Sequence, residues 1–120
     1  MNHVSHEQLE QINDAVNDVI NERFRQILEE GFNAAHDDEH NAGELCSAAS
    51  AYAIYAGDQI HPLSMGDGFR DGSIPDGWLW DASWWKPKTP RENLIKAAAL
   101  IIAEIERLDR NPQDAVINHD

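Results

Sequence analysis

Apolar residues recur at helical spacing over the first quarter of the chain. The stripe comprises Leu9, Ile12, Val16, Val19, Ile20, Phe24, Ile27 and Leu28. Ser5-His6-Glu7-Gln8 is typical of a capping box, and Gly31 is a natural helix end. The pattern predicts a long amphipathic helix over about residues 5–30. Because such a helix is marginal on its own in water, its stripe needs a partner.

Two further helices are expected. A run rich in small residues predicts the second over about 42–56, with Asn41 and Glu44 as a cap pair and Gly57 as its end. Thr89-Pro90-Arg91-Glu92 combines a cap, a proline suited to the first helical position and a capping-box acid. It predicts a third helix over about 90–109, apolar nearly all round at its centre. That helix is expected to be buried centrally or to form part of a dimer interface.

The segment 57–89 carries most of the glycines and prolines together with all four tryptophans. A loop of this length is uncommon inside a compact domain. We expect its tip, residues 65–73, to be mobile and its Trp-rich end to pack on the helices, since tryptophans favour burial. The tail 111–120 is polar and expected to be loose. The predicted fold is an all-α, three-helix bundle-like single domain over 1–120, with a long Gly/Pro/Trp-rich loop between the second and third helices.

Charge narrows the partners that this chain can have. The net charge is −13, of which −11 falls in residues 1–69. Such a field repels nucleic acid and anionic membranes, so no direct DNA binding is expected. No apolar stretch approaches the ~20 residues that cross a bilayer, and the N-terminus lacks the features of a signal peptide. We therefore expect a cytoplasmic protein without a membrane partner, in which the single cysteine, Cys46, is a buried, inert thiol.

The sequence His36-Asp37-Asp38-Glu39-His40 is the first candidate site. His36, His40 and Glu44 are spaced four apart and share a face if the second helix begins early, which is a spacing that can bind a transition metal. Asp37 and Asp38 add oxygen donors suited to Mg²⁺ or Mn²⁺. The alternative is that these residues form the acidic, solvated N-terminal end of a helix, where negative charge is favourable.

The second candidate site combines aromatic rings with positive charge just before the third helix. Trp80, Trp84 and Trp85 offer flat faces on which a nucleotide base could stack. Lys86 and Arg91, joined by Arg25 of the first helix, could hold phosphate near a helix N-terminus. The alternative is that the tryptophans close one end of a helical bundle while the lysines stay solvated.

The chain resembles a family of small accessory proteins of lambdoid phages and prophages. The residues that carry the resemblance span about 20 to 110: Glu22-Arg23-Phe24-Arg25-Gln26, Glu30-Gly31-Phe32, His36 to His40, Gly43-Glu44-Leu45, Tyr52-Ala53, Trp80 to Trp85, Lys86-Pro87, Pro90-Arg91 and Ala103 to Arg110. The resemblance implies a phage setting, in which accessory proteins often inhibit host defence, including by sequestering nucleotide signals.

A weaker similarity links Glu29-Glu30 and Glu106-Arg107-Leu108-Asp109 to the all-α MazG-like nucleotide pyrophosphohydrolases. Those enzymes hold magnesium with carboxylates on facing helices. In this chain the second helix offers only Glu44 for that purpose.

Three functions follow from these patterns. The first is a non-enzymatic phage accessory protein, homodimeric, that binds a small anionic ligand such as a nucleotide. The second is a metal-dependent nucleotide pyrophosphohydrolase using Asp37, Asp38, His40, Glu44 and Glu104. The third, based on the net charge, is an acidic inhibitor or nucleic-acid mimic of a host defence protein.

Overall fold

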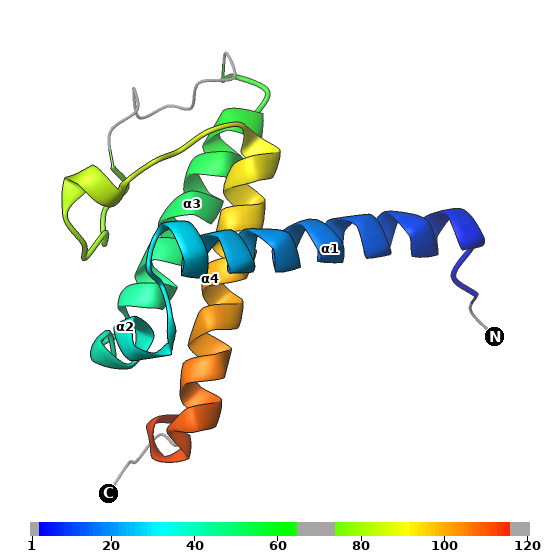
Figure 1. Ribbon diagram of the computed structural model, residues 1–120. Helices are drawn as coiled ribbons and strands as arrows, with labels where there is room; N and C mark the ends of the chain where they lie inside the picture. Colours follow the sequence, from blue (N-terminus) through cyan, green and yellow to red (C-terminus); the bar gives the residue numbers. More distant parts are fainter. Residues whose placement is uncertain (1–2, 65–73, 116–120) are drawn as a thin grey trace, which may run out of the picture.

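The computed structural model describes residues 3–64 and 74–115, and these are helical or irregular with no strand among them (Figure 1). In chain order the elements are α1 (His6–Glu29), α2 (Ala34–Glu39), α3 (Glu44–Ile60), the 3₁₀ turn η1 (Ala82–Trp84), α4 (Pro90–Arg110) and the 3₁₀ turn η2 (Pro112–Ala115). The all-α prediction is confirmed. Each described helix is too short or too polar to cross a membrane. The predicted mobile tip and the end of the predicted loose tail lie outside the described residues.

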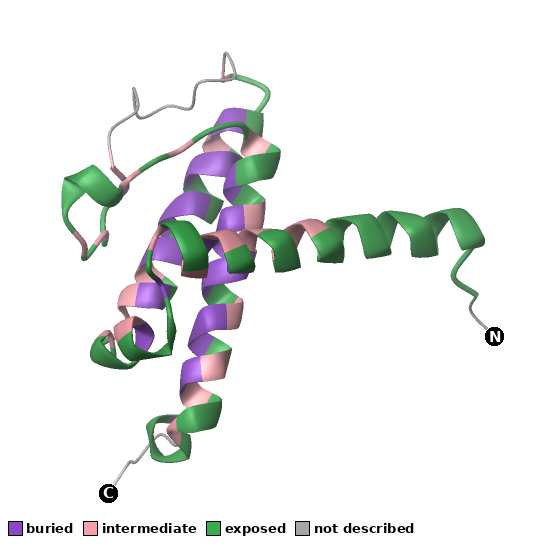
Figure 2. Ribbon diagram, viewed as in Figure 1, coloured by how far each residue is buried: buried purple, intermediate pink, exposed green. Residues whose placement is uncertain are grey.

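Helices α3 and α4 run antiparallel, side by side, and form the core (Figures 1 and 2). Their contact is built from alanines and a few larger side chains: Leu45, Ala48, Ala49 and Tyr52 of α3, and Ala97, Leu100 and Ala103 of α4. Small side chains let two helix backbones approach closely, so this pair buries its apolar surface with little bulk. Phe32, from the segment between α1 and α2, completes the cluster.

Helix α1 crosses this pair, and only its second half lies on it (Figure 1). Arg23 and Gln26 are its buried residues. Every residue from His6 to Asn17 is exposed, and that part of the helix extends away from the rest of the chain (Figure 2). The apolar stripe predicted for α1 is therefore present, but its N-terminal part has no partner among the described residues.

Most helix ends lie where the sequence placed them. The Ser5 hydroxyl accepts a hydrogen bond from the backbone N–H of Gln8 at 3.1 Å, and Gly31 follows α1 with a φ of +76°, a conformation that favours glycine. Thr89 caps α4 by accepting from the Glu92 N–H at 3.2 Å, with Pro90 in the first turn. These local predictions are confirmed because each depends on residues within one helical turn.

Two boundaries of the middle region differ from the prediction. The segment 32–41, predicted to contain no helix, forms α2, which is capped by the Asn33 side chain accepting from the His36 N–H at 2.9 Å. Gly43 rather than Asn41 is the N-cap of α3, and α3 continues past Gly57 to Ile60. A tertiary contact explains the extension: Asn93 of α4 donates to the Gln59 side chain at 2.8 Å, which fixes the last turn of α3.

Candidate functional site

The Trp-rich turn before α4 is held by short-range polar contacts. Asp81 caps η1 by accepting from the Ser83 N–H at 2.9 Å, and its backbone oxygen accepts from Trp78 Nε1 at 3.2 Å. The Tyr52 hydroxyl then links the turn to α3, since it accepts from the Lys86 N–H at 3.1 Å. The turn is thereby attached to α3, as the sequence predicted for its Trp-rich part.

The tryptophans of the turn differ in their contacts and in their exposure to solvent. Trp85 stacks on Tyr52 with ring centroids 4.7 Å apart and meets Tyr55 edge-on, so it packs against the core. Trp84 stacks on Phe32 at 5.5 Å and is 39% exposed. Trp80 contacts Phe32 at 5.4 Å. Trp85 therefore serves mainly in packing, whereas Trp84 keeps an accessible surface.

A small pocket lies where the turn meets α1 and α4, and we call it the aromatic pocket. It is lined by Glu22, Arg25, Gln26, Glu30, Phe32, Tyr52, Trp78, Trp80, Trp84, Lys86, Lys96 and Leu100. Its volume is about 20 Å³, which is room for about one water molecule. Two of its lining residues carry buried polar atoms without a hydrogen-bond partner among the described residues, namely Gln26 Oε1 and Trp80 Nε1. Unpartnered buried polar atoms are rare in proteins, so these two atoms suit a hydrogen bond to a water molecule or to a polar group of a ligand.

A larger opening adjoins this pocket, and we call it the basic cleft. It lies between α1 and the first turns of α4 and is lined by Asp18, Asn21, Glu22, Arg25, Lys88, Arg91, Glu92, Ile95 and Lys96. Its volume is about 320 Å³, at the small end of the range for ligand pockets. Glu22, Arg25 and Lys96 line both cavities. The two cavities therefore adjoin at these three side chains, and we treat them as one candidate site.

Positive charge is concentrated at this site. Five of the nine lysines and arginines of the chain line it: Arg25, Lys86, Lys88, Arg91 and Lys96. Some of these cations already have carboxylate partners. Arg25 Nε lies 2.8 Å from Glu22, and Lys86 lies 3.1 Å from Glu30. Burial opposes ionisation of Glu30, but Lys86 and Arg25 outweigh it and hold the pKa of Glu30 below its usual 4.5.

Lys96 is the one buried residue among these five cations. Its residue is 8% exposed, yet its ammonium has no ion pair among the described residues and lies 5.8 Å from the centroid of the Tyr52 ring. Burial lowers the pKa of Lys96 below its usual 10.5, because a desolvated ammonium is less stable than a solvated one. The Glu22 and Glu30 carboxylates act against this lowering without forming an ion pair, and an anion bound where the two cavities meet would stabilise the ammonium further.

The predicted ligand residues are largely brought together. Trp80, Trp84, Lys86 and Arg25 line the aromatic pocket, and Arg91 lines the basic cleft. Arg91 also pairs with Asp18 of α1 at 2.8 Å on the surface. Sequence reasoning missed Lys96. The signal was available, because Lys96 is a lone charge within the apolar run of the third predicted helix.

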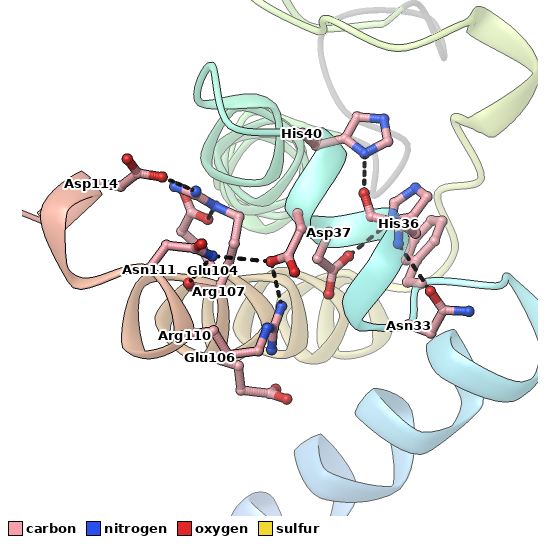
Figure 3. Close-up of polar contacts among 12 residues, drawn as sticks. Asn33, His36, Asp37, His40, Glu104, Glu106, Arg107, Arg110, Asn111 and Asp114 are labelled. Atoms are coloured by element: carbon pink, nitrogen blue, oxygen red, sulfur yellow. Dashed lines mark hydrogen bonds and ion pairs between the residues drawn. The ribbon is translucent and has the colours of Figure 1, made fainter.

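The predicted metal-binding residues have different partners, and Figure 3 labels His36, Asp37 and His40 among them. Asp37 is buried and accepts from Arg23 at 3.1 Å and from His36 Nδ1 at 2.9 Å. Asp38 faces α4 instead, where Arg110 donates to it at 3.0 Å. Glu44 accepts from the backbone N–H of Ala42 at 2.7 Å. The described residues hold no group of three or more His, Cys, Asp and Glu side chains placed to share a metal ion.

Both histidines of this cluster nevertheless lie beside the Trp-rich turn. The His36 and His40 rings are 5.9 and 5.5 Å from the Trp80 ring. Together with Asp81 and Trp84 they line a third cavity of about 180 Å³. The two candidate sites identified in the sequence therefore converge, and Trp80 and Trp84 line both this cavity and the aromatic pocket.

Cys46 is exposed, contrary to the prediction of a buried thiol. It lies at the edge of the α3–α4 contact, where its Sγ is 3.8 Å from Glu104. Partial burial, followed by the nearby negative charge of Glu104, raises the pKa of Cys46 above its usual 9.0. A thiol with a raised pKa is less often the reactive thiolate, so the reactivity of Cys46 is lowered although it is exposed.

Comparisons of the chain with protein-family models, with curated proteins and with solved structures found no match.

Proposed function

We propose that this protein binds a small anionic ligand of the nucleotide class in the site formed by the aromatic pocket and the basic cleft. One observation carries the proposal. Lys96 is a buried residue whose ammonium forms no ion pair among the described residues, although the Glu22 and Glu30 carboxylates attract it, and it lines both cavities. In a chain whose net charge is −13, a buried cation of this kind costs stability unless an anion compensates it.

The basic cleft suits the phosphate groups of such a ligand. Lys88 and Arg91 enter it from the start of α4, close to the capping residue Thr89, and Lys96 follows on the same helix. Arginine and lysine are the side chains that most often bind phosphate oxygens. The Asp18 carboxylate that pairs with Arg91 is itself partly exposed, so a phosphate can compete for that guanidinium.

The Trp-rich turn suits the base. The aromatic pocket itself holds only about 20 Å³, so the base is proposed to stack on the accessible surface of Trp84 at the edge of the site. Stacking on an aromatic ring is worth about 1–3 kcal/mol per base and tolerates any base. The unpartnered Trp80 N–H lies in the same turn and is a donor that the ligand can use.

The carboxylates of the basic cleft favour binding over metal-dependent hydrolysis. Asp18 pairs with Arg91 at 2.8 Å and Glu22 with Arg25 at 2.8 Å. Glu92 accepts from the Thr89 hydroxyl at 2.9 Å. All three are engaged with side chains of the protein, and two carboxylates that the hydrolase was expected to use, Asp37 and Asp38, pair with Arg23 and Arg110 instead. The proposed role is therefore sequestration of a nucleotide, in the phage setting implied by the sequence resemblance.

The experiment is a binding panel of nucleoside mono-, di- and triphosphates and cyclic nucleotides, followed by calorimetry and tryptophan fluorescence. Lys96→Met, Arg91→Ala and Trp84→Leu are each expected to weaken binding by about 10-fold or more. Lys96→Met should keep or raise thermal stability, because it removes a buried charge. Arg110→Ala is the matched control, since it removes one positive charge at the other end of α4.

Two results would overturn the proposal. One is that no nucleotide in the panel binds, and the other is that the Trp84 and Arg91 variants bind as tightly as the unmodified protein. Release of pyrophosphate from a nucleoside triphosphate with Mg²⁺ or Mn²⁺, stopped by Asp38→Ala, would favour the hydrolase instead.

A further inference from the structure

The first half of α1 exposes apolar side chains along a helix that no other described element covers. Leu9 and Ile12 are each 47% exposed and Val16 is 49% exposed. We call residues 6–17 the α1 arm (Figures 1 and 2). An uncovered helix of this length is marginal in water, and most helical stability in proteins comes from packing of the apolar face. The α1 arm therefore needs a partner.

The apolar residues of the arm belong to a heptad repeat. Leu9, Ile12, Val16, Val19, Arg23 and Gln26 follow one another at alternating spacings of three and four. This is the spacing that places one continuous line of side chains against a partner helix. We call these six residues the α1 seam. Its last two members, Arg23 and Gln26, are buried within the chain, which leaves its first members without an equivalent contact.

The seam leads into an apolar corner where α1 leaves α4. Ala15, Val16, Val19 and Ile20 of α1 and Ile102 of α4 line a cavity of about 200 Å³ there. No polar residue lines it. Ile101 and Ile105 of α4 are also half exposed. The exposed apolar surface of the arm thus continues onto α4 at Ile102 and forms one docking surface.

We propose that this surface binds a second copy of the same chain, through antiparallel pairing of the two α1 arms. In that register Leu9 contacts Val19 of the partner subunit, and Ile12 contacts Val16 of the partner subunit. A two-fold axis near residue 14 makes each contact occur twice, as in an isologous interface. The proposal does not depend on the ligand proposed above, and it assigns a surface to the homodimer expected from the sequence.

The charge pattern favours a second copy over a basic partner. The arm is acidic, with Glu7, Glu10 and Asp14 and no lysine or arginine. However, the heptad positions that flank the apolar residues are Gln8, Asn13, Ala15 and Ile20, none of which is charged. Flanking positions decide which partner a helix accepts. Two arms can pair without opposing acids across the seam, whereas a basic partner would find no carboxylate at these positions.

The test is sedimentation of the full chain across a range of concentrations, with two charge-matched variants. Ile12→Glu combined with Val16→Glu places two acids in the seam and is expected to give a monomer. Gln11→Glu combined with Asn17→Glu adds the same charge on the outer side of the arm and should remain dimeric. Circular dichroism checks that both variants fold. A monomeric unmodified chain at all concentrations, or a dimeric seam variant, would overturn the proposal.

Salt and cross-linking test the occupant and its orientation. Dimer affinity should rise between about 0.05 and about 0.5 M NaCl, because screening relieves repulsion between two acidic arms. Weakening with salt would count against self-pairing and in favour of a basic partner. In a Cys46→Ser background, Ile12→Cys with Val16→Cys should form a disulfide-linked dimer. Ile12→Cys alone should not form one, and efficient linking through that single cysteine would show parallel arms and reject the antiparallel register.

Discussion

Arg23 of α1 and Asp37 of α2 form a buried ion pair at 3.1 Å. The same guanidinium donates to Glu106 of α4 at 2.7 Å and to the backbone oxygen of Phe32 at 2.9 Å. One side chain thereby links α1 to α4 and holds α2 beside α4. Burial raises the pKa of Asp37 above its usual 3.8, against the opposing effects of His36 and Arg23, so this carboxylate is costly to keep ionised.

Loss of this carboxylate should destabilise the protein strongly. Asp37→Ala leaves the buried guanidinium of Arg23 short of one partner while Glu106 still pairs with it, so the expected cost is about 1–3 kcal/mol. Urea denaturation measures the free energy of unfolding. Asp38→Ala is the matched control, since it removes the neighbouring carboxylate from a surface contact with Arg110 and should change stability little. Equal losses in the two variants would contradict the structural role assigned to Asp37.

Two glycines should respond to the same substitution in opposite directions. Gly43 has a φ of +86°, so Gly43→Ala is expected to cost about 1 kcal/mol although no atom lies within 4 Å of the added methyl group. Gly57 lies inside α3, also with open space around it, and Gly57→Ala should stabilise by up to about 1 kcal/mol. Thermal unfolding of the two variants checks the signs. A stabilising Gly43→Ala would show that the left-handed conformation is not required at the start of α3.

Acid should destabilise the site through Glu30. Burial acts to raise its pKa, but Lys86 and Arg25 hold the folded-state pKa below 4.5. For a carboxylate with a lowered folded pKa, the stabilisation is present above about pH 4.5 and is lost as pH falls through the folded pKa. Glu30→Gln should therefore flatten the decline in melting temperature between about pH 5 and about pH 3. Glu7→Gln, on the exposed α1 arm, is the control, and the same flattening in it would contradict the assignment to Glu30.

The local features of the fold could be read from the sequence. Ser5, Gly31 and Thr89 fixed the ends of α1 and the start of α4 because capping depends on groups within one helical turn. The ends of α3 were harder to predict. A glycine such as Gly57 normally weakens a helix. The hydrogen bond from Asn93 of α4 to Gln59 nevertheless keeps the last turn of α3 in place.

The candidate site was predicted in part. The tryptophans and the cations Arg25, Lys86 and Arg91 were identified as a group because a short segment concentrates aromatic rings and positive charge. The role of Trp85 in packing and the buried position of Lys96 could not be read from spacing. Both depend on which face of α4 and which side of the turn meet Tyr52, and this is a relationship between distant segments.

The sequence by itself therefore determined the all-α class, the long helices and the residue types available for an anion site, since these depend on periodicity and local chemistry. Only the tertiary structure decided what the charged groups do. It pairs Asp37 with Arg23 and Asp38 with Arg110, and it leaves the ammonium of Lys96 without an ion pair among the described residues. The physical reason is that pairing of charges is set by distances across helix crossings, and no repeat along the chain encodes those distances.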